Sequence, residues 1–215
     1  MINSDNNYIY SDQVRFDILT LVPKTGFIIG SIGCGRASTE QVLVAAGREV
    51  HGVDISAEAV EVAKKRITSA RVVNGDVLMP FAENSLDGLI LADVIEHMPL
   101  AWNRLEQFAK MVKQGGWILI SVPNMRQLRV LYTLLLKGDW PEQPTGIFDE
   151  THIQVMTHKR LERWAVKSGL SLLKWQNSYF FRPQINAIYK LINLVTFNYF
   201  QSFFDYQILG LFIKK

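Results

Sequence analysis

Several common signals are weak or missing in this sequence. Its 215 residues include one cysteine, Cys34, which excludes an internal disulfide and leads us to expect a cytoplasmic location. The net charge of +3 is too small to indicate nucleic-acid binding by itself, and no secretory signal pattern or internal repeat is present. With 48% hydrophobic and 20% charged residues, we expect one globular domain over residues 1–215, with its core at about 14–175.

Strand-like and helix-like segments alternate along the chain. Strands are expected at residues 27–32, 49–53, 71–73, 86–91, 117–122, 170–175 and 207–213, and helices at 39–46, 57–67, 100–112, 127–136 and 158–167. Gly115 and Gly116 are expected to form a turn before the fifth strand. This order predicts an α/β, Rossmann-like, doubly wound sheet of seven mostly parallel strands with helices on both faces.

The most informative motif follows the first expected strand. Gly33, Cys34 and Gly35 form a glycine turn there, and Asp54 closes the second expected strand. Glycines let a backbone approach a ligand closely, and an acid at the end of the second strand can pair with ribose hydroxyls. This spacing predicts a nucleotide-binding half-site.

The ends of the third and fourth expected strands narrow the choice of ligand. Asp76 follows Gly75, where its carboxylate can accept a hydrogen bond from an adenine amino group, although an Asx turn is an alternative role. The fourth strand delivers Ala92 and Asp93 to the same edge of the sheet. These acids favour S-adenosylmethionine over a dinucleotide, whose third glycine would fall at Ser38.

Together these motifs resemble the class I S-adenosylmethionine-dependent methyltransferases, in the small-molecule branch called type 11. The matching segments, in order, are Gly33-Cys34-Gly35, Asp54, Gly75-Asp76, residues 81–87, Glu96-His97, residues 113–117 and residues 121–124. The resemblance implies S-adenosylmethionine as cofactor. It implies cofactor contacts from Ser31, Gly33, Cys34, Gly35, Asp54, Ile55, Gly75, Asp76, Val77, Ala92 and Asp93.

Two positions depart from the pattern of that family. Ser31 stands where the family usually has an acid that helps to orient the ammonium group of the cofactor, and Ala37 stands where it usually has glycine. Alanine restricts backbone torsions that glycine would allow. A non-catalytic partner subunit with this fold is therefore an alternative.

The loop after the fourth strand faces the methyl group in such a fold, so His97 is the candidate base. Glu96 is expected to orient His97 or to carry a solvated charge, and His152 to act as a second base or an acceptor ligand. Helix capping and loop hydrogen bonds are the structural alternatives for the two histidines.

A metal is the alternative use of these residues. The spacing of Asp93, Glu96, His97 and His152 resembles small-RNA terminal 2′-O-methyltransferases, and this resemblance implies a divalent ion that holds an acceptor diol. The chain lacks an ordered motif of basic and aromatic residues, so nucleic acid is not the expected partner. A divalent metal is possible but is not expected.

The last third of the chain points to a different acceptor. The run Asp149-Glu150-Thr151-His152, the following helix and an apolar tail resemble methyltransferases of polysaccharide and lipid-linked glycan pathways. This implies O-methylation of a sugar, a glycolipid or another small-molecule hydroxyl. Residues 183–215 are expected to form an apolar helix and a last strand. Within them, Ile185–Phe204 is expected to form a helix that covers the sheet or the substrate pocket. The alternative is a helix at the membrane surface that meets a lipid-linked glycan acceptor.

Overall fold

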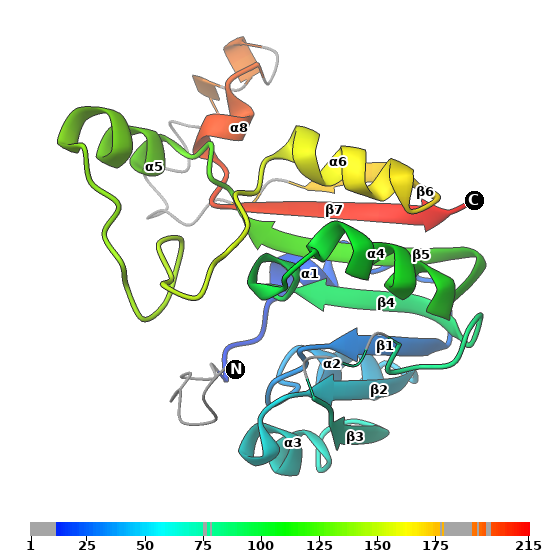
Figure 1. Cartoon of the computed structure of the whole chain (residues 1–215). Helices are drawn as coiled ribbons and strands as arrows, with labels where there is room; N and C mark the ends of the chain where they lie inside the picture. Colours follow the sequence, from blue (N-terminus) through cyan, green and yellow to red (C-terminus); the bar gives the residue numbers. More distant parts are fainter. Residues whose placement is uncertain are drawn as a thin grey trace.

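The computed structural model describes residues 12–74, 77, 79–176, 178, 191–192, 194–196 and 199–215. A seven-stranded sheet with strand order β3-β2-β1-β4-β5-β7-β6 forms its centre (Figure 1). The strands are β1 (Ile28–Ile32), β2 (Glu49–Asp54), β3 (Ser69–Val72), β4 (Leu86–Ala92), β5 (Val112–Pro123), β6 (Leu170–Gln176) and β7 (Gln207–Lys214). Strands β1 to β5 pair in parallel, whereas β7 is antiparallel to β5 and β6. The predicted mostly parallel, Rossmann-like sheet is confirmed.

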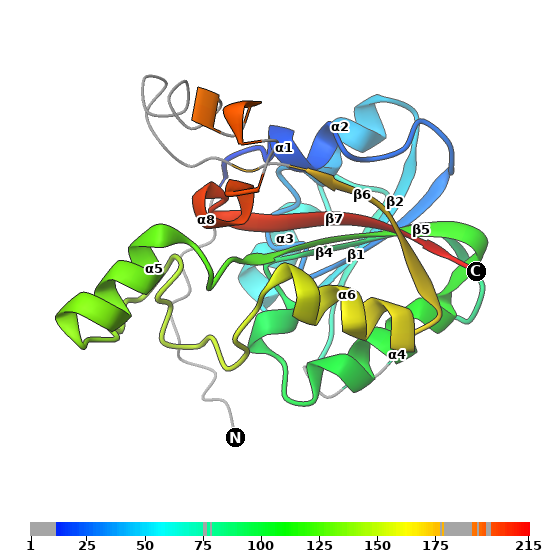
Figure 2. The same cartoon turned by 90° about the horizontal axis from the view of Figure 1, so that it is seen from above.

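Helices cover both faces of this sheet (Figures 1 and 2). One face carries α4 (Ala101–Met111) and α6 (His158–Lys167), and the other carries α1 (Phe16–Leu19), α2 (Glu40–Ala45) and α3 (Ala57–Ala63). Each face has its own buried apolar cluster, because strands with helices on both sides are apolar throughout. The first cluster includes Leu89, Leu105, Phe108, Leu161 and Phe212, and the second Ile18, Ile29, Leu43, Val60 and Leu119.

Two of the helices begin at a residue whose side chain caps them. The Ser56 hydroxyl accepts the Ala59 N–H over 3.2 Å at the start of α3, and the Thr157 hydroxyl accepts the Arg160 N–H over 3.2 Å at the start of α6. Such caps satisfy N–H groups that have no partner within the helix. The first of these helices ends at Ala63 and is therefore shorter than the predicted span of 57–67.

The start of β5 differs from the prediction of a glycine turn followed by a strand at Trp117. The strand begins at Val112, and its register shifts between the Leu86–Val112 pair and the Gly88–Trp117 pair. Gly115 adopts φ of +74° inside this irregular stretch. The glycines therefore form a bulge within β5, because pairing with β4 already starts before them.

The helix expected at 127–136 is divided. It consists of α5 (Leu128–Tyr132) and a π-helical turn, η2 (Thr133–Lys137), and the Thr133 hydroxyl donates to the Arg129 carbonyl over 2.8 Å at their junction. A threonine that bonds back to the preceding turn competes with the regular helical ladder. Both elements project from the body of the protein beside β7 (Figure 2).

Residues 185–190, 193, 197 and 198 of the predicted Ile185–Phe204 segment lie outside the described residues. Its last part forms α8 (Gln201–Phe204), which leads directly into β7. None of the helices in the described part of the chain is both long and apolar enough to cross a membrane.

The packing of Gly88 against Trp117 gives a test of this core. A Cβ on residue 88 would lie 2.1 Å from the Trp117 ring, so we expect Gly88→Ala to lower the free energy of unfolding by about 2 kcal/mol through overpacking. Urea denaturation measures this loss. The same substitution in a Trp117→Leu background should cost less than 1 kcal/mol by the same overpacking argument. An equal loss in both backgrounds would contradict the ring contact as its cause.

Candidate active site

The turn that follows β1 is held against two neighbouring strands. The backbone N–H groups of Gly33 and Cys34 donate to the Val53 carbonyl over 2.8 and 3.2 Å. Gly33 has φ of +68°, and a Cβ there would lie 2.4 Å from Cγ2 of Val94. Conformation and space therefore both require glycine at this position. Cys34 is buried, and burial raises the pKa of its thiol, so this cysteine stays protonated and is unsuited to act as a nucleophile.

Asp54, at the end of β2, organises the second half of this turn. Its Oδ2 accepts the Gly35 N–H over 2.7 Å, and its Oδ1 accepts the Ser56 N–H over 2.9 Å. The next residue, Ile55, is 63% exposed and offers an apolar side chain beside the buried acid. The predicted ribose acid thus also fixes the glycine turn, a role that the sequence reasoning did not include.

The remaining predicted cofactor contacts follow β3 and β4. Gly75 and Asp76 lie outside the described residues, so the predicted adenine contact stays a prediction. Val77 is 40% exposed. Ala92 ends β4 and pairs with Ser121 of β5, which places it at the carboxyl edge of the sheet near the glycine turn.

Asp93 comes directly after β4 and is bound by an arginine that the sequence did not indicate. Its φ is +55°, and its Oδ2 lies 2.7 Å from Nη1 of Arg15. Arg15 also pairs with Asp17 over 2.8 Å and donates to the Ser121 hydroxyl over 3.2 Å. The predicted site residue Asp93 is therefore one member of a charge network that ties the N-terminal segment to the carboxyl edge of the sheet. No pattern in that segment marked the arginine.

Ser31 and Ala37 are the two positions that depart from the family pattern. The Ser31 hydroxyl is buried and donates to Oε1 of Glu40 over 2.7 Å. Ala37 adopts φ of +55°, a left-handed conformation that costs an alanine about 1 kcal/mol more than a glycine. The sequence reasoning missed Glu40. Its helical spacing of three residues from the buried Leu43 was the signal that places it on the inner face of α2.

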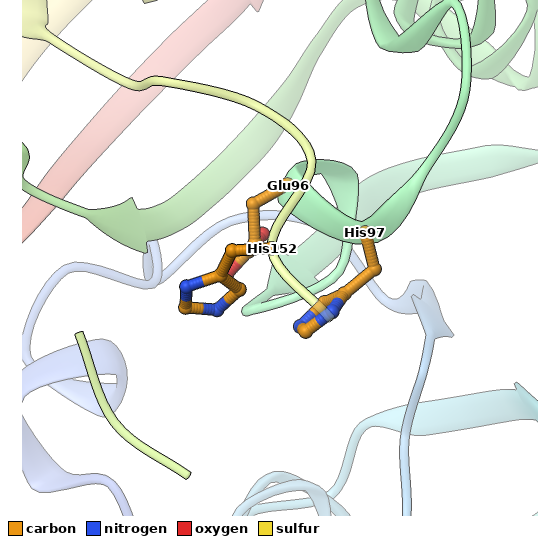
Figure 3. A group of neighbouring side chains, drawn as sticks. All are labelled: Glu96, His97 and His152. Atoms are coloured by element: carbon orange, nitrogen blue, oxygen red, sulfur yellow. The ribbon is translucent and has the colours of Figure 1, made fainter. Parts of the chain in front are cut away.

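Figure 3 shows three further side chains that meet at one place. Glu96 and His97 belong to the short helix η1 (Ile95–His97), and His152 comes from the long loop before α6. One nitrogen of each histidine and one Glu96 oxygen all lie within 4.8 Å of one another, and the two ring centroids are 4.7 Å apart. The structure thus brings these three predicted site residues together.

Hydrogen bonds fix the ring of His97 in one tautomer. The Thr151 hydroxyl donates to Oδ1 of Asp149 over 2.5 Å, so at its other side it acts as an acceptor. Nδ1 of His97 lies 2.8 Å from this hydroxyl and 3.3 Å from the Thr151 carbonyl, and both oxygens call for a proton on Nδ1. The Nε2 atom of neutral His97 therefore carries the lone pair and can accept a proton.

Glu96 has a different role from the predicted one. Its side chain is fully buried, and within the described part of the chain neither carboxylate oxygen has a hydrogen-bond partner. The predictions that it bonds to His97 or carries a solvated charge are therefore wrong. Its backbone carbonyl accepts the N–H groups of Ile153 and Gln154 over 3.0 and 3.1 Å, and these bonds hold the loop that carries His152.

Burial and charge set the protonation of this cluster. Burial, followed by repulsion from Asp93 and Asp149, raises the pKa of Glu96 well above its usual range. Burial and the neighbouring His97 lower the pKa of His152, whose Nδ1 is also buried without a partner in the described residues. Both shifts favour the uncharged forms, a protonated carboxyl group on Glu96 and a neutral imidazole on His152.

Comparisons with known proteins agree with the fold. Residues 31–120 match the family described as "Methyltransferase domain". Residues 31–120 therefore carry a methyltransferase domain, and the comparisons support a class I S-adenosylmethionine-dependent methyltransferase. The ubiquinone biosynthesis O-methyltransferase of Alkalilimnicola ehrlichii is 26% identical to it over 176 residues, which cover 78% of this chain and 69% of that protein. Two further proteins of the same name are matched over 47% and 70% of their own lengths.

Solved structures with this fold include other methyltransferases. A SAM-dependent methyltransferase from Archaeoglobus fulgidus has a TM-score of 0.61 at 19% identity, covering 89% of this chain and 87% of that one. Magnesium protoporphyrin IX methyltransferase from Synechocystis PCC 6803, with bound SAH, has a TM-score of 0.62 at 16% identity, covering 88% and 75%. At sequence identities this low, the likeness to these structures establishes only the fold of the chain.

The carboxyl edge of the sheet fits S-adenosylmethionine. The cofactor carries positive charges on its sulfonium and ammonium groups, and the ends of β2 and β4 bring Asp54 and Asp93 to this edge. The turn at Gly33 and Gly35 allows close approach of the backbone. The residues present therefore suit a cofactor that is cationic at one end and carries an adenosine at the other.

Replacement of Asp54 tests this arrangement. In Asp54→Asn one oxygen can accept an N–H group, but the amide NH2 faces the second N–H, so the turn loses one of its two anchors. We expect affinity for S-adenosylmethionine to fall about tenfold or more, as expected when a buried hydrogen bond is lost. Isothermal titration calorimetry measures the change. Glu61→Gln removes an exposed carboxylate of α3 and should leave the affinity unchanged. Wild-type affinity in Asp54→Asn would contradict this role.

Proposed function

We propose that the methyltransferase transfers a methyl group to the hydroxyl oxygen of a small molecule that binds beside Glu96, His97 and His152. The main support is the fixed tautomer of His97, which leaves a lone pair on Nε2. His97 lies in the segment after β4, next to the carboxyl edge of the sheet where the cofactor is expected. Attack on a sulfonium methyl group requires a hydroxyl to lose its proton, and a neutral imidazole can accept that proton. The O-methyltransferase names of the relatives support the same reaction class.

The chain contributes mainly alignment and proton transfer to this reaction. S-adenosylmethionine, when bound, supplies the electrophilic methyl group. We propose that Asp54, Ile55 and the glycine turn hold its adenosine part and that Asp93 lies near the amino-acid part. His97 then takes the hydroxyl proton at Nε2 and keeps its Nδ1–H on Thr151. His152, neutral because its pKa is lowered, contacts the acceptor on the opposite side.

We further propose that the acceptor is a sugar, a glycolipid or a lipid-linked glycan. The support is the resemblance of the Asp149–His152 run and the helix after it to glycan-pathway enzymes. Exposed apolar side chains also gather on the projecting α5–η2 unit, where an apolar portion of an acceptor or a membrane surface can bind. They include Leu128, Tyr132, Leu134, Leu135 and Leu136.

Substitution of the two histidines tests the proposed chemistry. We expect His97→Gln to lower kcat for a hydroxyl acceptor by about 100-fold or more, as loss of a general base does, with unchanged affinity for S-adenosylmethionine. His152→Asn should raise KM for the acceptor more than it lowers kcat. His51→Asn is the matched control, since His51 bonds to Glu49 and Ser69 far from the cluster. Wild-type turnover in His97→Gln, with sugar and phenolic acceptors alike, would contradict the base role.

A metal-assisted reaction on a diol is a second candidate, and the buried Glu96 is the observation that favours it. A carboxylate without a hydrogen-bond partner next to two imidazoles, one with a free Nε2, offers three ligand atoms to one divalent ion. Such an ion would bind both oxygens of a diol and lower the pKa of one of them.

Chelation separates the two candidates. If the metal is required, treatment with EDTA should abolish methyl transfer, and Zn²⁺, Mn²⁺ or Mg²⁺ should restore it. In Glu96→Gln the metal should then bind at least tenfold more weakly, consistent with loss of one charged ligand. If the histidine alone removes the proton, EDTA should leave the rate unchanged, and the acceptor should need only one hydroxyl.

A further inference from the structure

Glu40 is a buried acid to which the proposed function assigns no contact with the cofactor. It is the first residue of α2 and is 6% exposed. Its carboxylate reaches the end of β1, where the Ser31 hydroxyl donates to it over 2.7 Å. Ser31 is 1% exposed and stands two residues before Gly33, so the pair lies directly beneath the glycine turn.

This carboxylate has no cationic partner within the described residues. None of the ion pairs there includes Glu40, and the nearby Arg15 is already bound to Asp17 and Asp93. Burial, together with repulsion from Asp54, raises the pKa of this acid, whereas hydrogen bonds from the Ser31 hydroxyl and from the backbone at Glu40 and Thr39 act in the opposite direction. Buried carboxylates are normally paired with a cation or fully hydrogen-bonded. Glu40 therefore has hydrogen-bond donors around it but lacks a cation in the described part of the chain, and a ligand can supply one.

We propose that Glu40 and Ser31 together bind the ammonium group of the amino-acid part of S-adenosylmethionine. An ammonium group has three N–H donors and no acceptor. The Ser31 hydroxyl donates its proton to Glu40, so its oxygen can act only as an acceptor toward the ligand, and the carboxylate supplies the charge. A charge-assisted contact of this kind is about twice as strong as a neutral hydrogen bond.

The pair also accounts for the serine at position 31. In the methyltransferases that the chain resembles, an acid at this position carries the charge itself. Here α2 provides the carboxylate from the other side of the turn, and Ser31 connects it to the strand end. The inference concerns cofactor binding alone and does not depend on the acceptor or on the chemistry at His97.

The test uses isothermal titration calorimetry to compare the affinities of two ligands whose sulfur atom is an uncharged thioether. S-adenosylhomocysteine carries the ammonium group, whereas 5′-methylthioadenosine keeps the adenosine and lacks the amino-acid part. Glu40→Gln preserves the size of the side chain and its oxygen acceptor for Ser31 but removes the charge. We expect this variant to bind S-adenosylhomocysteine at least tenfold more weakly and 5′-methylthioadenosine within twofold of the wild type.

A charge-relocation variant provides the rescue. In the double variant Ser31→Asp with Glu40→Gln, the carboxylate moves to the strand end, and we expect affinity for S-adenosylhomocysteine to return to within threefold of the wild type. Ser31→Ala, which leaves α2 intact, should lose three- to tenfold for the same ligand only. Glu61→Gln on α3 controls for the removal of any carboxylate.

Two results would overturn the inference. Equal losses for both ligands in Glu40→Gln would mean that this acid only supports the glycine turn. Unchanged binding of S-adenosylhomocysteine in Glu40→Gln and Ser31→Ala would mean that the ammonium group binds elsewhere. Neither result would bear on the proposed acceptor chemistry, because no methyl transfer is measured.

Discussion

The hydrogen bonds between Asp54 and the loop that follows β1 are the constraint on which the site depends. Parallel strands β1 and β2 end side by side, and the carboxylate closing β2 accepts an N–H group from Gly35 and another from Ser56. One buried acid thereby fixes the glycine turn and the start of α3 together. Because the sheet order reverses between β1 and β4, this fixed turn faces the crevice in which such folds bind their ligands.

Charge around that crevice is unevenly distributed. Buried or half-buried acids approach it from α2, β2 and η1, while Arg15 is the cation that pairs with Asp93. An excess of carboxylate in a low-dielectric place is unfavourable unless protons or cations compensate for it. A positively charged cofactor provides such compensation at one end of the crevice. At the other end, burial raises the pKa of Glu96 and so favours the uncharged form of that acid.

The two histidines show how a long loop can contribute to a site. His152 lies in a connection without regular structure, yet the Glu96 carbonyl accepts two N–H groups just after it. Thr151 and Asp149 complete the attachment by fixing the ring of His97. Buried Ile147 and Phe148, which pack on Met125 and Val130, support the same loop from behind. The loop is thus a packed part of the site, and the hydrogen bonds of Thr151 and Asp149 within it orient His97.

The sequence by itself determined the seven strands and the glycine turn, and it indicated His97 and His152 as candidate site residues. These depend on local periodicity and spacing, which nearby residues fix. Only the tertiary structure decided that Arg15 pairs with Asp93 and that Glu40 lies under Ser31. It also decided that Thr151, and not Glu96, orients His97. These contacts join separate elements through side-chain burial and direction, and neither is encoded in the spacing of residues along one element.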